Sequence, residues 1–488
     1  MALKVLFVTS ECVPFSKTGG LGDVSGALPR ALAARGVEVR VVTPLYAGFD
    51  WGRLERLEGT LAVPMGWGGV AYGGVRLGRL PGSPVAVYFL EHHHFFDRPY
   101  LYGPPGEAYG DNLERFTFLS RGALTLCHAL GWTPEVVHAH DWQTALVPIY
   151  VDTVEHGSPV GAAATLFTIH NLAYQGVFAP DRLPVTGLGW EHYRPEELEH
   201  FGAMNLMKGA FAHATLLSTV SPTYAREIQT PAYGYGLDGV LAARGGDLVG
   251  ILNGIDTEEW DPQRDPHLPA PFSAEDLSGK ERCKAALQEE AGLPQRPEVP
   301  LIGMVGRLTT QKGLDVLAHC LHGILDLDLQ LVMLGTGDPE AEAFFGRVAA
   351  ERPDRFRAWL HFDEGRAHRI EAGADLFLMP SRYEPCGLNQ LYSLRYGTLP
   401  IVRATGGLAD TVVNFDEATG EGTGFVFHDL TPQAIYDTVG WAVATWYRRR
   451  GDFEAMRRRA MDQHLPWDRS AARYEAAYRQ ALARRHGG

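Results

Sequence analysis

The feature that most constrains the fold is a regular alternation of short apolar runs with helix-like stretches along the whole chain. This alternation is typical of βαβ units, which build parallel sheets covered by helices. A segment rich in Pro and Asp, from Asp261-Pro262 to Pro271-Phe272, separates two series of runs. We predict strands near 4–10, 37–43, 85–90, 135–139, 164–169, 214–219 and 248–252, then near 300–305, 329–334, 358–362, 375–379, 399–402 and 424–427, with helices between them.

The length of the chain indicates more than one domain. At 488 residues it exceeds the size at which one core stops growing, so two domains of about 200–250 residues are expected. The predicted fold class is α/β, with two Rossmann-like, doubly wound domains. We assign 1–258 to the first domain, 259–465 to the second and 466–488 to a C-terminal helix.

Charge and cysteine content restrict the partners and the compartment. The formal net charge of −14 disfavours nucleic acid or an anionic membrane as the main partner, so an anionic ligand needs locally placed Lys and Arg. The five cysteines are scattered and never spaced as C-x-x-C, which argues against a disulfide framework or structural zinc. No signal peptide or membrane span is recognised, and a cytoplasmic protein is expected.

Two of the six lysines occupy matching places after apolar runs. Lys17 stands in Lys17-Thr18-Gly19-Gly20-Leu21-Gly22, and Lys312 stands in Arg307-x4-Lys312-Gly313. A helix N-terminus offers unpaired N–H groups, so glycine and a cation there can form an anion pocket. The motifs predict one such pocket in each half of the chain, suited to a phosphorylated ligand. Glycine at a strand-to-helix turn is also often only a geometric requirement, and this alternative stays open.

Polar residues follow several predicted strands, where ligands of open α/β sheets bind. In the second half, Arg307 and Lys312 can converge on a diphosphate. Glu384 can bind sugar or ribose hydroxyls, or serve as a helix N-cap partner. The run Thr405-Gly406-Gly407 can form a second phosphate cradle.

The first half offers histidines at comparable places. His170 ends a predicted strand and can bond a sugar hydroxyl, although a structural histidine is an equal alternative. The spacing His138-x-His140 resembles a pair of metal ligands. No further ligand cluster is apparent, so no metal site is predicted.

Charged runs elsewhere are interpreted as exposed faces, and one apolar stripe is interpreted as buried. Asp326-Leu327-Asp328 and Arg457-Arg458-Arg459 are expected to lie in solvent. A helix is predicted over 470–485, and its apolar residues recur at helical spacing and need a partner surface. These residues are Tyr474, Ala477, Tyr478, Ala481 and Leu482.

With these residues in place, the chain resembles the family of bacterial glycogen synthases and plant starch synthases. These are retaining glucosyltransferases of the GT-B type, with two Rossmann-like domains facing a central cleft. Many members of broader retaining families carry the motif E-x7-E. In this sequence its first position is Glu384, but its second is Tyr392. The likeness rests on Lys17-Thr18-Gly19-Gly20-Leu21-Gly22-Asp23-Val24, His140-Asp141-Trp142-Gln143, Arg307-Leu308-x3-Lys312-Gly313, Glu384-Pro385-Cys386-Gly387-Leu388 and Thr405-Gly406-Gly407-Leu408.

The resemblance implies roles for individual residues. It also implies that the C-terminal helix crosses back to the first domain. No cofactor or metal is predicted, because the sequence offers no convincing ligand set for a cation. Residues with an implied catalytic role are Lys17, Asp141, His170, Arg307, Lys312 and Glu384. Residues with an implied substrate contact are Gly19, Gly20, Asn171, Asn253, Cys386, Gly387, Leu388, Thr405, Gly406 and Gly407.

The implied activity is transfer of glucose from ADP-glucose to the non-reducing end of an α-1,4-glucan, with retention of configuration. Glycogen or a malto-oligosaccharide would be the acceptor. Two alternatives remain: a glycosyltransferase that uses UDP-glucose or another acceptor, and a noncatalytic glucan-binding protein. The joint presence of Lys17, Arg307, Lys312 and Glu384 favours an enzyme, because binding alone would tolerate their loss.

Overall fold

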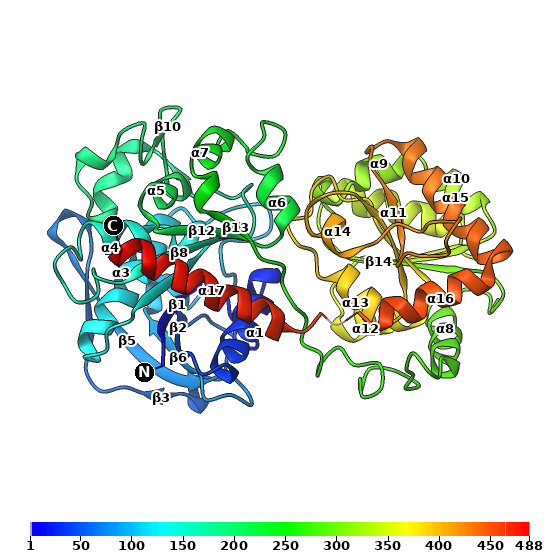
Figure 1. Ribbon diagram of the computed structural model, residues 1–488, viewed down its shortest axis with the longest axis horizontal. Helices are drawn as coiled ribbons and strands as arrows, with labels where there is room; N and C mark the ends of the chain where they lie inside the picture. The colour runs from blue at the N-terminus through cyan, green and yellow to red at the C-terminus, as the bar shows by residue number, and fades with distance from the viewer. Residues whose placement is uncertain (1, 464, 488) are drawn as a thin grey trace. The chain divides into compact units, whose positions relative to one another are not determined.

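The chain forms two compact units (Figure 1). The computed structural model describes residues 2–463 and 465–487, so residues 1, 464 and 488, which the predicted domain ranges include, lie outside the described residues. Unit 1 comprises Met1–Gly254 and Trp467–Gly488, and unit 2 comprises Ile255–Pro466. The α/β class with two largely parallel sheets is as predicted.

Unit 1 is built on a mixed sheet whose strand order is β13-β12-β8-β7-β1-β2-β6-β5-β3. The strands from β13 to β6 are parallel, and the order reverses between β1 and β7. All of these parallel strands fall where the apolar runs predicted them. Their bounds are β1 (Lys4–Val8), β2 (Glu38–Pro44), β6 (Ala86–Glu91), β7 (Val136–His140), β8 (Ala164–Ile169), β12 (Leu216–Thr219) and β13 (Leu248–Gly250).

The prediction of a helix between β2 and β6 is wrong. The segment forms β3 (Glu55–Arg56), β4 (Leu61–Pro64) and β5 (Val70–Arg79), and β5 pairs antiparallel with β6. The frequent Gly and Pro residues of this segment disfavour a helix, and the unpaired edge of β6 supplies hydrogen-bond partners. A further small antiparallel sheet contains β9 (Val177–Phe178), β10 (Glu199–His200) and β11 (Ala203–Asn205).

Unit 2 is built on a parallel sheet with the order β16-β15-β14-β17-β18-β19. In chain order this is the 3-2-1-4-5-6 arrangement of a doubly wound Rossmann fold, which reverses between β14 and β17. The prediction at 358–362 lies too late for β16. The bounds are β14 (Leu301–Val305), β15 (Gln330–Leu334), β16 (Phe356–Trp359), β17 (Leu376–Met379), β18 (Leu399–Arg403) and β19 (Phe425–Phe427).

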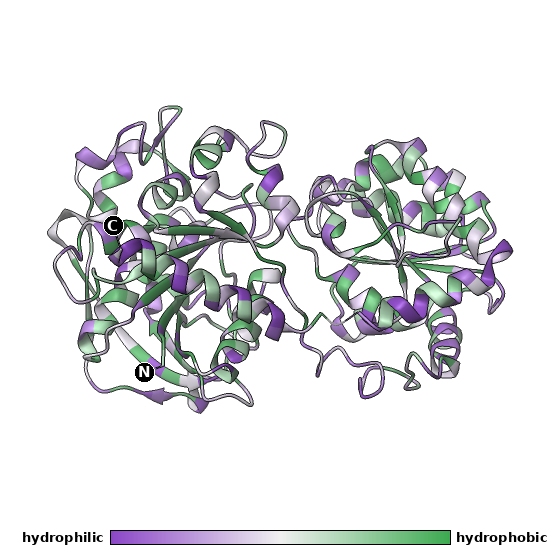
Figure 2. Ribbon diagram, viewed as in Figure 1, coloured by the Kyte–Doolittle hydropathy of each residue, from purple (hydrophilic) through white to green (hydrophobic). Residues whose placement is uncertain are grey.

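Helices cover the sheets, and hydrophobic residues concentrate in the strands (Figure 2). Within the described residues, no helix combines the length and apolar character needed to cross a membrane. In unit 1 the helices are α1 (Gly20–Ala34), α2 (His93–Phe96), α3 (Asn112–Ala129), α4 (Leu146–Asp152), α5 (Leu206–His213), α6 (Pro222–Glu227), α7 (Asp238–Ala243) and α17 (Trp467–His486). In unit 2 they are α8 (Ser278–Ala291), α9 (Leu314–Ala318), α10 (Leu321–Asp326), α11 (Pro339–Glu351), α12 (Glu364–Gly373), α13 (Asn389–Arg395), α14 (Gly406–Thr411), α15 (Pro432–Arg448) and α16 (Arg450–Met461).

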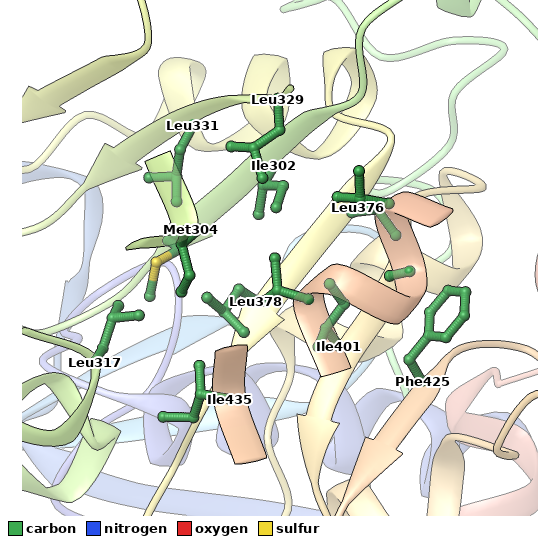
Figure 3. Close-up of a cluster of buried hydrophobic side chains, with 14 of the residues drawn as sticks. Ile302, Met304, Leu317, Leu329, Leu331, Leu376, Leu378, Ile401, Phe425 and Ile435 are labelled. Carbon is green, nitrogen blue, oxygen red and sulfur yellow. The ribbon is translucent and has the colours of Figure 1, made fainter. Parts of the chain in front are cut away.

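The core of unit 2 shows why apolar runs predict parallel strands. Both faces of a parallel sheet are covered, so its strands are apolar on both sides. On one face, side chains of β14, β15, β17, β18 and β19 meet side chains of α9 and α15 (Figure 3). Labelled examples are Ile302, Met304, Leu331, Leu376, Leu378, Ile401, Phe425, Leu317 and Ile435.

The predicted exposure of the run Arg457-Arg458-Arg459 is wrong at Arg457. This side chain is buried, and its Nη2 lies 2.9 Å from Oδ1 of Asp375. Lys284 Nζ lies 2.7 Å from Oδ2 of the same carboxylate. The buried Asp375 is thus satisfied by cations from α8 and α16, as burial of a charge requires. By contrast, Asp326 and Asp328 are exposed and pair with surface arginines, as a solvated face predicts.

The C-terminal helix α17 packs on unit 1 against α1 and β8. Four residues of the predicted stripe, Tyr474, Ala477, Tyr478 and Ala481, are buried, and Leu482 is partly buried. The hydroxyl of Tyr478 lies 2.8 Å from Nδ1 of the buried His138. On the other side of that ring, Nε2 lies 2.6 Å from Oγ1 of Thr168. His138 therefore joins the terminal helix to the sheet.

We expect Tyr478→Phe to lower the free energy of unfolding by about 1–3 kcal/mol, because it leaves Nδ1 of the buried His138 without its partner. Chemical denaturation of the full chain measures the effect. Arg479→Ala, on the exposed face of the same helix, is the control and should change little. Equal stability of wild type and Tyr478→Phe would contradict the structural role of this bond.

Candidate functional site

The cations predicted to bind a diphosphate lie where the strand order of unit 2 reverses. Arg307 follows β14, and Ser381 and Glu384 follow the neighbouring β17. Arg307, Lys312 and Ser381 border a pocket at the carboxyl ends of β14, β15 and β17. Its other lining residues are mainly apolar: Met304, Val305, Gly306, Leu308, Leu314, Met333, Leu334, Leu378, Met379 and Pro380. Such switch points are the usual ligand sites of doubly wound sheets.

Glu384 is held through one of its two carboxylate oxygens. Lys312 Nζ lies 2.6 Å from Oε2, and Ser381 Oγ donates to the same atom at 2.9 Å. Neither oxygen accepts a bond from a helix N–H among the described residues, so the N-cap alternative does not apply there. Oε1 accepts no hydrogen bond from these residues either. The buried Glu384 is therefore fixed in orientation while one oxygen stays available to a ligand.

Arg307 differs from Lys312 in its surroundings. Its side chain is exposed at the pocket, and it forms no hydrogen bond or ion pair with the part of the chain that the structure describes. Cys386, Gly387 and Leu388 form the turn from Glu384 into α13. The amide of Asn389, at the start of α13, donates to the carbonyl oxygen of Val305 at 2.6 Å. This bond connects the turn to the end of β14.

Two glycines are required because backbones approach closely. Gly313 has φ +70°, and a Cβ there would lie 1.9 Å from the carbonyl oxygen of Pro380. Gly406 has φ +45°, and a Cβ would lie 1.8 Å from the carbonyl oxygen of Glu384. Side chains cannot be accommodated at such distances. The geometric reading of glycine therefore applies to both motifs of unit 2.

The predicted phosphate cradle after β18 is partly engaged within the protein. Thr405 is the N-terminal cap residue of α14 and is buried. The N–H of Gly407 is directed to the carbonyl oxygens of Glu384 at 3.1 Å and Pro385 at 3.2 Å. A phosphate oxygen would accept a hydrogen bond from this N–H only if the bonds to these two carbonyl oxygens broke.

The glycine loop of unit 1 is closed by a carboxylate of the protein itself. Glu11, just beyond β1 and 3% exposed, accepts the N–H groups of Thr18 at 2.7 Å and Gly19 at 3.2 Å. It also accepts the hydroxyls of Thr18 and Tyr102, each at 2.6 Å. The loop does hold an anion, but that anion is Glu11. This differs from the predicted open pocket.

Lys17 is the exposed cation of this loop. Its Nζ lies 2.7 Å from Oδ1 of Asp23 in α1, and its side chain is 44% exposed. Gly20 begins α1 directly after the loop. An external phosphate would therefore meet the ammonium group of Lys17 rather than the N–H groups of Thr18 and Gly19.

The neighbouring strands β7 and β8 bring Asp141 and His170 together. Asp141 follows β7 with φ +56°, an uncommon conformation for a residue other than glycine. Its Oδ1 accepts the N–H groups of His170 at 2.7 Å and Asn171 at 3.3 Å. His170 Nε2 lies 2.9 Å from Nδ1 of His140. Asn171 Oδ1 in turn accepts the N–H of Ala173, so this part of the site is tightly bonded.

Burial controls ionisation in this cluster. Burial raises the pKa of Asp141 to about 7, an effect that the two N–H bonds oppose and the charge of Glu11 assists. Burial also lowers the pKa of His170 to about 3. His170 is therefore neutral at physiological pH, and Asp141 titrates close to it. Strongly shifted ionisable groups are typical of functional sites.

Asn253 lies beyond β13, at the edge of the same sheet. The residue is buried, and its Oδ1 has no hydrogen-bond partner among the described residues. A buried acceptor without a partner is unfavourable, which fits an atom reserved for a ligand or water.

As the pH rises from 5 to 8, we expect the unfolding free energy of Asp141→Asn to increase relative to that of the wild type. The folded pKa of about 7 lies above the ordinary value of 3.8, so neutral Asp141 favours folding at low pH. This contribution is lost as the pH rises through about 7, and Asn cannot ionise. Urea unfolding of both proteins at several pH values measures the difference, with the exposed Asp181→Asn as control. A pH-independent difference for Asp141→Asn would contradict the raised pKa.

Gly406→Ala should lower the unfolding free energy of unit 2 by about 2 kcal/mol or more, because the new methyl group overlaps the Glu384 carbonyl. Gly440→Ala is the matched control, since a Cβ at that position in α15 meets nothing within 4 Å. That change should stabilise by about 0.5–1 kcal/mol through helix propensity. Thermal melts distinguish the two, and equal melts would show that the turn tolerates a side chain.

Comparison with known proteins relates both units to glycosyltransferases. Residues 4–243 match the family model described as the starch synthase catalytic domain, and residues 288–456 match that of glycosyl transferases group 1. The chain is 54% identical to glycogen synthase 1 of Geobacter sulfurreducens, with 99% of this chain and 97% of that protein covered. It is 55% identical to a glycogen synthase of Anaeromyxobacter sp. strain Fw109-5, covering 99% and 100%.

Solved structures agree with these matches. The catalytic domain of starch synthase IV from Arabidopsis thaliana, solved with ADP and acarbose, aligns with a TM-score of 0.91 and 34% identity, covering 99% of this chain and 100% of that one. Sucrose-phosphate synthase from Thermosynechococcus elongatus aligns with a TM-score of 0.61 and 18% identity, covering 99% of each chain, and so shares the fold. The predicted GT-B-type fold and the family resemblance are confirmed. The chain belongs to the glycogen synthase family and is a glycosyltransferase.

Proposed function

We propose that the enzyme transfers glucose from ADP-glucose to the non-reducing end of an α-1,4-glucan, with retention at the anomeric carbon. The observation that carries this proposal is the pocket of unit 2, where Arg307 and Lys312 stand beside a carboxylate held by one oxygen. Two cations suit a diphosphate, and a carboxylate oxygen suits sugar hydroxyls. Support for an adenine nucleotide comes from the starch synthase that was solved with ADP.

In the proposed reaction, the bond between the anomeric carbon and the diphosphate oxygen breaks as charge develops on the leaving group. Arg307 and Lys312 stabilise that charge more in the transition state than in the bound donor. An acceptor hydroxyl attacks from the face that the diphosphate leaves, and its proton passes to the departing phosphate oxygen. Positive side chains perform the task that a divalent cation performs in other phosphate chemistry.

We assign unit 1 to the transferred sugar and the acceptor. The neutral imidazole of His170 suits a hydrogen bond to a sugar hydroxyl, and Asp141 fixes the backbone that carries it. The unpartnered Oδ1 of Asn253 is a further acceptor for a hydroxyl. The ammonium group of Lys17, which pairs with Asp23, is a further polar group for the substrate of this unit.

The direct test is an assay of the purified protein with ADP-glucose or UDP-glucose and with glycogen or malto-oligosaccharide, in the presence and absence of EDTA. We expect release of ADP and lengthening of the glucan by α-1,4-linked glucose, unchanged by EDTA. NMR of the product reports the anomeric configuration. Turnover with UDP-glucose alone would favour the first alternative, and binding without turnover would favour a noncatalytic glucan-binding protein.

Lys312→Ala and Arg307→Ala should each reduce kcat by about 10²-fold or more, because the charge that these residues meet grows as the diphosphate leaves. Arg382→Ala is the matched control, since this arginine also follows β17 but pairs with the exposed Asp315. Melting curves check that each variant folds. Near-normal kcat in both pocket variants would show that the diphosphate binds elsewhere.

A further inference from the structure

A second cluster of ionisable side chains lies in unit 1, formed by residues that the proposed reaction does not use. His192 ends the 3₁₀ turn Trp190–His192, and Glu197 lies in the loop before β10. His213 is the last residue of α5. Their potential ligand atoms all lie within 4.8 Å of one another. The side chain of Glu197 is buried, and those of His213 and His192 are 9% and 17% exposed.

One oxygen of Glu197 faces both histidines. Oε2 lies 2.7 Å from Nδ1 of His192 and 3.3 Å from Nε2 of His213. Arg194 holds the other oxygen, with Nε 3.1 Å from Oε1 and a second bond from Nη2. The arginine thus fixes the carboxylate and leaves Oε2 to the histidines.

His213 is oriented by a carboxylate on its other side. Nδ1 lies 3.0 Å from Oδ2 of Asp152, the last residue of α4, and Oδ1 of Asp152 lies 3.1 Å from Arg485 of α17. Nε2 is buried and has no hydrogen-bond partner among the described residues, although Oε2 of Glu197 is near. A carboxylate behind the imidazole, with the second nitrogen directed at a shared point, is the arrangement that surrounds metal-bound histidines.

We propose that Nδ1 of His192, Oε2 of Glu197 and Nε2 of His213 bind one divalent transition metal ion, with Zn²⁺ as the preferred ion. Two histidines and one glutamate are an established zinc ligand set. Tetrahedral ligands at about 2.0–2.1 Å from zinc lie about 3.3 Å apart, the separation found between His213 and Glu197. The distance between Nδ1 of His192 and Oε2 of Glu197 needs to increase by about half an ångström. His192, at the end of a 3₁₀ turn, can provide this increase by rotating its side chain.

The competing occupant of this site is a proton. Burial acts to lower the pKa of His213, but the hydrogen bond to Asp152 and the charge of Glu197 outweigh it and raise the pKa above its ordinary value. A protonated His213 shared by two carboxylates would also satisfy this cluster. Metal and proton then compete for the same nitrogen, so metal binding strengthens as the pH rises.

The bound ion would connect segments of unit 1 that are far apart in the sequence. It joins the loop 190–197 to the end of α5, and Asp152 with Arg485 continues the connection to α17. The ion would therefore stabilise unit 1, since a ligand that binds only the folded state raises the melting temperature. It takes no part in the proposed reaction, so chelation should lower the melting temperature without changing turnover in the folded enzyme.

The test is a titration of the full-length, EDTA-treated protein with Co²⁺, a spectroscopic substitute for Zn²⁺. We expect one equivalent to produce the visible absorption bands of four-coordinate Co²⁺, which Zn²⁺ then removes. His192→Gln and Glu197→Gln should abolish the bands, and Asp152→Asn should weaken binding by about 10–100-fold through loss of orientation. His93→Gln is the matched control, because the exposed His93 pairs with Asp97 at 2.7 Å elsewhere in unit 1.

The titration of the wild type decides the proposal even if a variant fails to fold. Absence of stoichiometric bands in the wild type would overturn it and assign the cluster to a shared proton. Bands that persist in both His192→Gln and Glu197→Gln would also overturn it. A melting temperature that Zn²⁺ raises in wild type and His93→Gln, but not in His192→Gln, would support it.

Discussion

The constraint on which the structure depends is that parallel strands are covered on both faces and end at the same edge of a sheet. Charged groups are excluded from the covered faces unless they are paired, as Asp375 is by Lys284 and Arg457. Polar side chains therefore gather at the carboxyl ends of the strands. In each unit they gather beside the point where the strand order reverses, after β1 and β7 in unit 1 and after β14 and β17 in unit 2.

At both edges the protein supplies its own counter-charges. Glu11 occupies the N–H groups of the first glycine loop, and Glu384 pairs with Lys312 in the second unit. Buried charges are costly when unpaired, and the carboxylates of Glu11 and Glu384 are both satisfied by partners within the protein. In the function proposed above, a diphosphate that attracts Lys312 competes with Oε2 of Glu384, while Oε1 stays available to the donor sugar. In the proposed reaction, phosphate binding and sugar binding are thus linked through one ion pair.

The sequence predicted the parallel strands, because their apolar runs reflect burial on both faces. It also predicted that Arg307, Lys312 and Glu384 follow strands, whereas the pairing of those two strands comes from the sheet order. It did not predict the antiparallel strands β3 to β5, since strands rich in glycine lack a clear period. It missed the burial of Arg457 and the closure of a loop by Glu11, because both depend on partners distant in sequence. The contact of Asp141 with the His170 backbone needs the register of two strands, which no spacing reveals.

The terminal helix illustrates how such distant partners reach the site. Tyr478 bonds His138, whose ring centroid lies 4.0 Å from that of His140, and His140 bonds His170. The buried His138 and His140 and the partly buried His170 form a continuous row from α17 to the end of β8. Protein interiors are packed like organic crystals, so a shift at one end of such a row displaces its neighbours. The helix that completes unit 1 therefore also fixes the ring of His170, although its own residues lie outside the proposed chemistry.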